Sequence, residues 1–478
     1  MTEGASILSA QTGLILLGLM SVLWIALGLY WGRGDDTLDS HMLAGRNVGL
    51  ALGAATGVAT WVTSNTTMLA PQFALELGVW GMIAYSTASI GLFMFTPLAE
   101  RIREVMPEGY TSTEFVRLRY GQAAANVFLL ISLAYAFTWL ASMAMAGGFL
   151  LESLSGIPYF WGMSAILAVC TVYTIVGGLK AVIGTDFIQS AIILIGVIVV
   201  ALAVLQAVPL NEVYSQIETN RPALLDMLLP AALMALFNNL LFGIGEIFHS
   251  NVWWSRAFAM RKGVGRKAYV VAGLLWLPIP VAAGFIALSA PALDINVPHV
   301  NMVAPIVVGE LLGQGGALLV FIVVFASIAS SIDSLLAATS DLLTKDILGN
   351  MFFRGADNTR LRGMTTYATL GLSICAWLVC TRVEVDLGTI LFGVGPFVGA
   401  TIWPIMAGLY WDRASTTGAI LGMVCGAASG LVVHWTIGWY AATLVGTGVS
   451  MCAVVACAFL LPARFNFADL KLEKGAAE

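Results

Sequence analysis

Runs of about twenty apolar residues recur along this chain, separated by short polar breaks. A helix of that length crosses the hydrocarbon core of a bilayer. Only helices fit such runs, because every backbone polar group must be satisfied within its own segment in lipid. The sequence therefore predicts an all-α membrane protein with about thirteen transmembrane helices. The expected spans are 8–31, 47–75, 79–99, 122–152, 158–178, 187–208, 225–250, 268–290, 305–345, 364–381, 386–411, 415–434 and 438–462.

The composition excludes a water-soluble domain. Of the 478 residues, 59% are hydrophobic and 10% are charged, whereas a soluble domain has about a quarter of its residues charged. Membrane lipid is thus an expected partner, and nucleic acid is not. The first residues lack the basic start of a signal peptide, so none is expected. The six cysteines have neither a disulfide nor a zinc spacing and are expected to pack as small apolar residues.

The basic residues predict the orientation. When the thirteen spans alternate and the N-terminus lies outside, 20 of the 22 Lys and Arg residues fall inside, and only Arg221 and Arg382 fall outside. This bias is typical of inner- or plasma-membrane proteins. We therefore expect a multi-pass protein with an external N-terminus and a cytoplasmic C-terminus. The basic segment 256–267 is predicted to face the cytosol as a topology anchor.

Two spans carry polar interruptions. Residues 63–67 form a run of Thr, Ser and Asn within the span 47–75, and two Asn, two Gly and Glu246 fall within 237–249 of the span 225–250. These spans stand five apart, and each would open one five-helix unit. Matched broken helices point to a transport site at the midplane of the membrane. The alternative is that the small and hydroxyl residues only let helices approach closely.

A stripe of serines marks the span 305–345. Ser327, Ser330, Ser331 and Ser334 follow the spacing i, i+3, i+4 and i+7, so one helical face presents four hydroxyls. Hydroxyls, together with carbonyls of an unwound helix, supply the oxygen ligands that a sodium ion needs. Asp333 lies about 60° round the helix from Ser330, and a carboxylate at this depth is a functional candidate. The alternative is a packing seam in which Asp333 bonds to the backbone.

Asp186 stands at the cytoplasmic start of the span 187–208. A carboxylate there is favoured by the dipole of the helix that follows. Position alone therefore gives it a structural role, and a functional role needs further support.

Four segments, in this order, resemble the sodium:solute symporter family. They are 110–121 (YTSTEFVRLRYG), 177–189 (GGLKAVIGTDFIQ), 254–256 (WSR) and 326–334 (ASIASSIDS). The resemblance covers about residues 41–460 and implies the LeuT-type fold with a 5+5 inverted repeat. The expected division is a peripheral helix and loop in 1–46, repeats in 47–208 and 209–411, and two peripheral helices with a tail in 412–478.

The resemblance also implies site residues. Sodium would bind the backbone carbonyls of Ala59 and Val62 and the serines Ser327, Ser330 and Ser331. A second cation would bind Asp186, Ser330, Asp333 and Ser334. The family often has Ser where this chain has Asp333, and the added carboxylate would strengthen that second site or replace its sodium with a proton. Substrate positions would be Trp61, Asn65, Thr66, Tyr85 and Glu246.

The implied substrate is a small polar organic solute. The residues at these positions differ from those of sugar-binding relatives, and Ser250 replaces an aromatic residue of choline transporters. The segment 64–76 resembles the urea-transporter branch, so an amide, amine or carboxylate solute remains open. The sequence sets no oligomeric state.

The predicted function is sodium-coupled symport of such a solute by alternating access, with no cofactor beyond the coupling ion. One alternative is a proton-coupled carrier in which Asp333 or Glu246 holds the proton. A second is a solute sensor that acts through a separate kinase. An enzyme is not expected, because the chain has no His-Glu-x-x-His motif, intramembrane Asp pair or Gly-x-Ser-x-Gly elbow.

Overall fold

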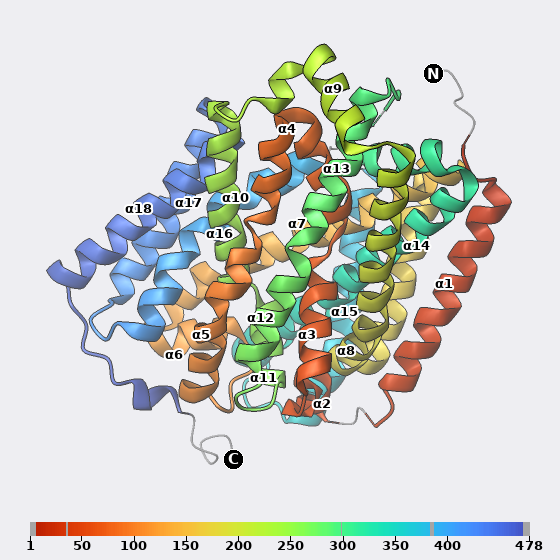
Figure 1. Ribbon diagram of the computed structural model, residues 1–478. Helices are drawn as coiled ribbons and strands as arrows, with labels where there is room; N and C mark the ends of the chain where they lie inside the picture. The colour runs from red at the N-terminus through yellow and green to blue at the C-terminus, as the bar shows by residue number, and fades with distance from the viewer. Residues whose placement is uncertain (1–5, 35–36, 298, 383–386, 472–478) are drawn as a thin grey trace.

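Long helices that cross the molecule from end to end form its framework (Figure 1). The computed structural model describes residues 6–34, 37–297, 299–382 and 387–471. Within these residues no β-strand forms, and the one β-type pairing is an isolated bridge between Val48 and Met260. The prediction of an all-α membrane protein is confirmed.

The first half of the chain forms α1 (Ala10–Trp31), α2 (Leu38–Leu43), α3 (Leu50–Trp61), α4 (Ala70–Ser86), α5 (Ser89–Val105), α6 (Ser112–Tyr120), α7 (Gln122–Ser155), α8 (Tyr159–Ala207) and α9 (Leu210–Asn220). The second half forms α10 (Pro230–His249), α11 (Asn251–Ala259), α12 (Gly265–Trp276), α13 (Pro278–Ala292), α14 (Val303–Leu342), α15 (Asn358–Cys380), α16 (Leu387–Tyr410), α17 (Thr416–Thr436) and α18 (Trp439–Leu460). Short 3-10 turns are η1 (Ala44–Arg46), η3 (Pro222–Leu225), η4 (Val300–Met302) and η6 (Phe467–Leu470), and π-helical turns are η2 (Asn65–Leu69) and η5 (Leu343–Phe352).

The expected count of thirteen spans is not confirmed. Eleven described stretches are long and apolar enough to cross a membrane. One reason is that α8 covers both predicted spans 158–178 and 187–208 without a polar loop. At Gly178 it kinks, with φ 51° and ψ −147°. A Cβ there would lie 2.5 Å from the carbonyl oxygen of His41, so both the backbone conformation and the close packing require glycine.

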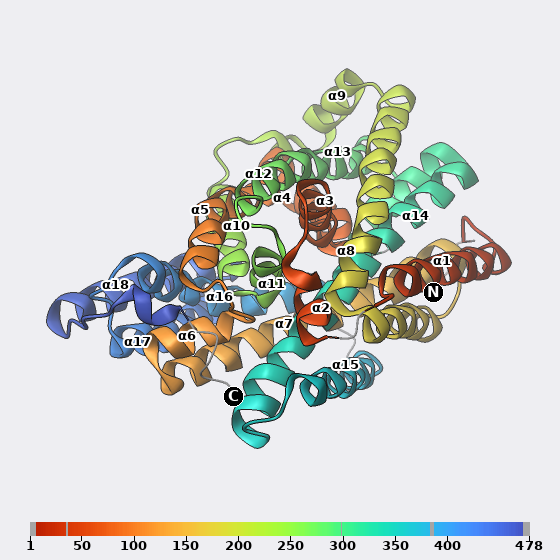
Figure 2. The same ribbon diagram turned by 90° about the horizontal axis from the view of Figure 1, so that it is seen from below.

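The outer helices present apolar side chains to their surroundings. On α1, Leu14, Leu19 and Val22 are each more than half exposed. In Figures 1 and 2, α1 lies at one side of the bundle against α8, while α17 and α18 lie at the opposite side against α16. Large apolar side chains on such an outer surface suit contact with lipid. The helices α3, α10 and α11 lie near the middle of the molecule (Figure 2).

The second predicted interruption lies later in the chain than expected. Residues 237–249 are part of the continuous helix α10, and the break falls at Ser250, where φ is −69° and ψ is 128°. The two glycines serve packing instead. A Cβ on Gly243 would lie 2.7 Å from the Cα of Ala88, and a Cβ on Gly245 would lie 2.6 Å from the carbonyl oxygen of Val398. Close helix contact, one of the alternatives for these residues, therefore explains them.

This packing gives a testable effect on stability. We expect Gly243→Ala to lower the free energy of unfolding by about 1–3 kcal/mol, because the added methyl overlaps the backbone of α4–α5 and the helices must shift. The measurement is an unfolding titration of the purified protein in mixed micelles. Gly371→Ala on α15 is the matched control, because its Cβ would meet no atom within 4 Å. Equal stability of the two variants would contradict this close packing.

Candidate cation and solute site

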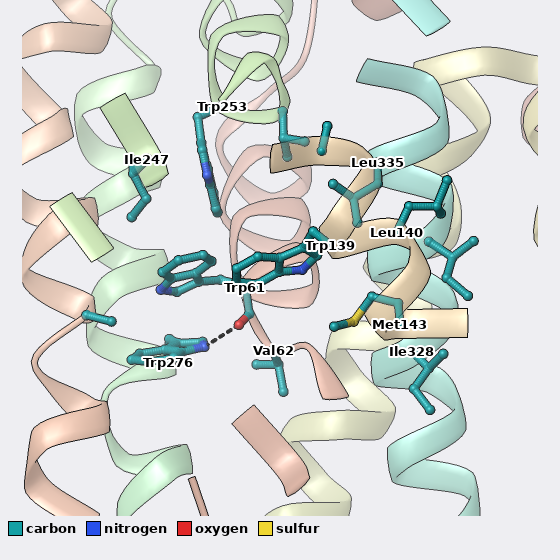
Figure 3. Close-up of a cluster of buried hydrophobic side chains, with 14 of the residues drawn as sticks. Trp61, Val62, Trp139, Leu140, Met143, Ile247, Trp253, Trp276, Ile328 and Leu335 are labelled. Carbon is teal, nitrogen blue, oxygen red and sulfur yellow. Dashed lines mark hydrogen bonds between the residues drawn. The ribbon is translucent and has the colours of Figure 1, made fainter. Parts of the chain in front are cut away.

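The first broken helix places free backbone in the protein interior. The helix α3 ends at Trp61, and Val62 takes the non-helical angles φ −83° and ψ 82° before η2 begins. The carbonyl of Trp61 accepts hydrogen bonds from Nε1 of Trp276 (2.7 Å; Figure 3) and from Oγ1 of Thr66 (3.0 Å). Oγ1 of Thr63 accepts from the backbone N–H of Asn65 at 3.0 Å. Side chains thus satisfy part of the interrupted backbone, which makes a break tolerable at this depth. The predicted interruption of the span 47–75 is present.

The serine stripe of α14 faces that break. Oγ of Ser330 donates to the carbonyl of Ala59 at 2.8 Å, and Oγ of Ser331 donates to the carbonyl of Ser327 at 2.9 Å. Ser327 itself bonds back to the carbonyl of Val323. Ala59, Val62 and the three serines are at most 1% exposed. Ser330 therefore brings a hydroxyl of α14 to a carbonyl of α3 away from water, whereas the hydroxyls of Ser327 and Ser331 bond within α14.

Next to this group, a buried arginine crosses between four helices. Arg256 of α11 is 0% exposed. Its Nη2 lies 3.3 Å from Oδ2 of Asp186 and 2.7 Å from both Oγ1 of Thr60 and Oγ of Ser334. Its Nε donates to Oγ1 of Thr56 at 2.9 Å. A guanidinium with this many partners fixes α3, α8, α11 and α14 relative to one another.

The prediction that Arg256 anchors a cytosolic loop is wrong. The sequence places it in a basic segment, but its side-chain partners are three hydroxyls and one carboxylate on other helices, which sequence spacing does not reveal. Two of the residues predicted to bind a second cation already have a cationic partner. Arg256 forms an ion pair with Asp186 and donates a hydrogen bond to Ser334. Oδ1 of Asp186 has no partner among the described residues.

Asp333 turns away from the arginine and toward α8. Its Oδ2 accepts from the hydroxyl of Tyr173 at 2.7 Å and from Oγ1 of Thr185 at 3.5 Å, and its Oδ1 accepts from Oγ of Ser334 at 3.3 Å. All of these side chains are buried. Three hydroxyls thus surround its carboxylate, and the backbone of Ser334 bonds to it as well, so the alternative of a backbone-bonded Asp333 is met in part.

A small aromatic cavity lies beside the break. Its free space is about 10 Å³, room for about one water molecule, and it is lined by Trp61, Thr63, Thr66, Tyr85, Ala88, Trp139, Asn239, Phe242 and Trp276. The ring of Trp61 stacks against Trp139 at a centroid distance of 6.4 Å, and Trp276 packs at 5.7 Å (Figure 3). No charged side chain is among the lining residues. A solute could enter only if these rings moved apart, and the lining would then favour a compact, uncharged ligand that stacks on rings and bonds to hydroxyl or amide groups.

Only three of the five substrate positions that the resemblance implies lie at the cavity. Trp61, Thr66 and Tyr85 line the cavity, whereas Asn65 and Glu246 do not. Neither polar atom of the Asn65 side chain has a partner within the described residues.

Asn239 also lines the cavity. From the sequence it was predicted only to interrupt the span 225–250. Its side-chain amide donates to the carbonyls of Ala84 (2.9 Å) and Tyr85 (3.2 Å). These carbonyls lie where α4 gives way to α5, so Asn239 ties α10 to a second irregular backbone segment. Its position in a polar pair, Asn238–Asn239, was the available signal. Trp139 and Trp276 carried no such signal, since a tryptophan in an apolar span is ordinary.

The broken central helix, the buried polar cluster and the enclosed cavity together define a multi-pass membrane transporter fold. A sodium-coupled sialic acid symporter in a substrate-bound outward-open state has the same fold: the TM-score is 0.81 at 16% identity, over 95% of this chain and 99% of the other. MhsT in complex with L-phenylalanine matches with a TM-score of 0.56 at 16% identity, over 86% and 98% of the two chains. The LeuT-type fold is confirmed.

The chain belongs to the sodium:solute symporter family, whose model matches residues 41–426. Among its relatives, the urea-proton symporter DUR3 of Oryza sativa subsp. japonica is 26% identical over 84% of this chain and 61% of its own length. The sodium/pantothenate symporter of Escherichia coli is 27% identical over 86% and 89%, and the osmoregulated proline transporter OpuE of Bacillus subtilis is 24% identical over 88% of both. The chain thus spans about three fifths of the rice protein's length. These relatives are transporters, not enzymes.

Proposed function

We propose that the protein is a sodium-coupled symporter of a small, uncharged polar solute. The observation that carries the proposal is the contact of Ser330 with the carbonyl of Ala59 at the end of a broken helix. This contact joins two segments that each offer oxygen ligands. A sodium ion that binds both would hold α3 and α14 in one relative position, and its release would free them to move.

The cavity supports the choice of solute. Its polar groups are hydroxyls and one amide, and no ionised side chain lines it. A charged solute would lose its hydration there without a countercharge, whereas a planar amide stacks on indole rings and exchanges hydrogen bonds with Thr66 or Asn239. Relatives of this chain include proteins named as urea transporters. Urea is therefore the first solute to test.

The predicted orientation is part of this proposal. The segment that carries Arg221 follows α9, at the end of the molecule opposite to α2 and α6 in Figure 1. Arg46 and Arg119 lie at the α2 and α6 end. We propose that this basic end faces the cytoplasm of a cell with the protein in its inner or plasma membrane.

The test is uptake of radiolabelled urea into proteoliposomes that contain the purified protein. We expect an inward sodium gradient to drive urea above its equilibrium level, and an equal potassium gradient to fail. L-proline and pantothenate serve as comparison solutes, and we expect neither to compete, because each carries a carboxylate. Asn239→Leu should abolish uptake, whereas Glu212→Gln on the exposed surface of α9 should not change it. Urea uptake that is indifferent to sodium would refute the proposed coupling.

A further inference from the structure

One buried carboxylate has no place in the sodium group or in the cavity wall. Glu246 lies in the last turn of α10 and is 4% exposed. Both of its carboxylate oxygens accept from the same donor, Nε1 of Trp253 on α11, at 3.1 and 3.0 Å. Tyr135 on α7 lies near the carboxylate, and its hydroxyl has no hydrogen-bond partner among the described residues.

No fixed positive charge balances Glu246. The described residues give it no ion pair, and Arg256, one turn beyond Trp253 on α11, directs its guanidinium to Asp186 instead. The titratable groups near it are Tyr135 on α7 and Tyr85 on α4, while the ring of His249 on its own helix bonds to the backbone carbonyl of Gly245. An ionised carboxylate within a membrane protein, without a countercharge, is strongly unfavourable.

A metal ion is a poor solution to that imbalance. Sodium needs several oxygen ligands, but the group that faces both carboxylate oxygens is an indole N–H, which directs its positive end toward the site. A proton needs no ligand shell. It neutralises the carboxyl group and leaves the other oxygen free to accept from Trp253.

The neighbours of Glu246 pack against the wall of the cavity. Trp253 packs edge-on against Trp61 at 5.4 Å, and Tyr135 packs against Trp139 at 5.2 Å. Trp61 and Trp139 both line the cavity, and Figure 3 shows Trp253, Trp61 and Trp139 grouped around the end of α3. The side chain of His249, whose Nε2 has no partner among the described residues, packs on Tyr135 at 4.7 Å. A change at the Glu246 carboxylate therefore reaches the cavity through two direct ring contacts.

We propose that Glu246 binds one proton from the side on which solute enters and releases it on the other side, so that solute movement is coupled to protons as well as to sodium. The step is a reversible protonation: the carboxylate takes up H⁺ from water when its path is open and returns H⁺ to water on the opposite side. This inference rests on the proposed function, because it assigns a second coupling ion to the same transport cycle.

The experiment uses proteoliposomes with a pH-sensitive dye in the lumen and equal sodium on both sides. Urea added outside should acidify the lumen as protons enter with it. Glu246→Gln, which resembles the protonated carboxyl group, should abolish the acidification while sodium still raises the melting temperature of the variant. Glu212→Gln is the control and should acidify like the unmodified protein.

A second measurement does not depend on the solute. Infrared spectra of the unmodified protein should show the C=O stretch of a neutral carboxylic acid that titrates with pH and is missing from Glu246→Gln. If the glutamine variant fails to fold, Glu246→Asp, which keeps the carboxyl group on a shorter side chain, should keep the band but shift its frequency and the pH at which it titrates, and an unchanged band would assign it to another group.

The outcomes separate the two proposals. Sodium-driven urea uptake without lumen acidification would overturn the proton site and leave the symport standing. An infrared band unchanged in Glu246→Gln would also overturn it. A protein that shows the titrating band but transports no urea with sodium would refute the proposed function and, with it, the proton coupling, and would leave Glu246 only as a group that binds a proton.

Discussion

Replacing Arg256 with alanine should abolish solute uptake and lower the free energy of unfolding by about 3–5 kcal/mol. The guanidinium is the one cation paired with Asp186 among the described residues, and its loss leaves a carboxylate buried without a partner charge. Thr56, Thr60 and Ser334 lose a donor at the same time. The measurements are sodium-driven uptake in proteoliposomes and an unfolding titration of the purified protein.

Two further variants separate charge from geometry. Arg256→Lys keeps the charge but not the forked donor group, so we expect partial recovery of stability and little recovery of uptake. The double variant Arg256→Met with Asp186→Asn removes both charges and should be more stable than Arg256→Ala. Arg221→Ala, on the exposed surface, is the control and should change stability by less than about 0.5 kcal/mol. An Arg256→Ala protein with normal stability and uptake would show that the buried cluster has no structural or transport role.

Replacing Ser330 with alanine should raise the sodium concentration that gives half-maximal uptake by about tenfold or more, which corresponds to ~1.4 kcal/mol of binding free energy. The change removes an oxygen that contacts the carbonyl of Ala59 and leaves that carbonyl without its partner. Ser331→Ala should act in the same direction. Ser330→Thr, which keeps a hydroxyl, should retain most of the sodium affinity.

Ser340→Ala is the matched control for this series. Ser340 is also a buried serine of α14, but its hydroxyl bonds only to the carbonyl of Ala337 in its own helix. We expect its sodium dependence to match that of the unmodified protein. If Ser340→Ala and Ser330→Ala shift the sodium dependence equally, the effect comes from altered helix packing and not from a lost ligand.

The break in α3 and the serine stripe could be predicted because both are local patterns. A run of Thr, Ser and Asn in an apolar span, and hydroxyls at helical spacing, are visible in a few consecutive turns of one chain. The break in the α10 region was misplaced for the opposite reason. Gly243 and Gly245 serve contacts with Ala88 and Val398, which belong to distant parts of the sequence.

The site around Arg256 could not be predicted because its partners come from three other helices. Each of Thr56, Asp186 and Ser334 has an ordinary local interpretation, and only the tertiary arrangement brings them within hydrogen-bond distance. The same holds for the cavity, where Trp139 and Trp276 look like any apolar side chains. The helix lengths could not be predicted either, since α8 runs through both predicted spans 158–178 and 187–208 with only a kink at Gly178 between them.

Equilibrium binding of ²²Na⁺ to the purified protein tests the central claim most directly, because it requires neither a known solute nor a membrane gradient. We expect saturable binding to the unmodified protein that excess unlabelled sodium displaces and potassium does not. The double variant Ser330→Ala with Ser331→Ala should bind no ²²Na⁺, and Ser340→Ala should bind as much as the unmodified protein. Equal ²²Na⁺ binding by the double variant and the unmodified protein would contradict a sodium site between α3 and α14.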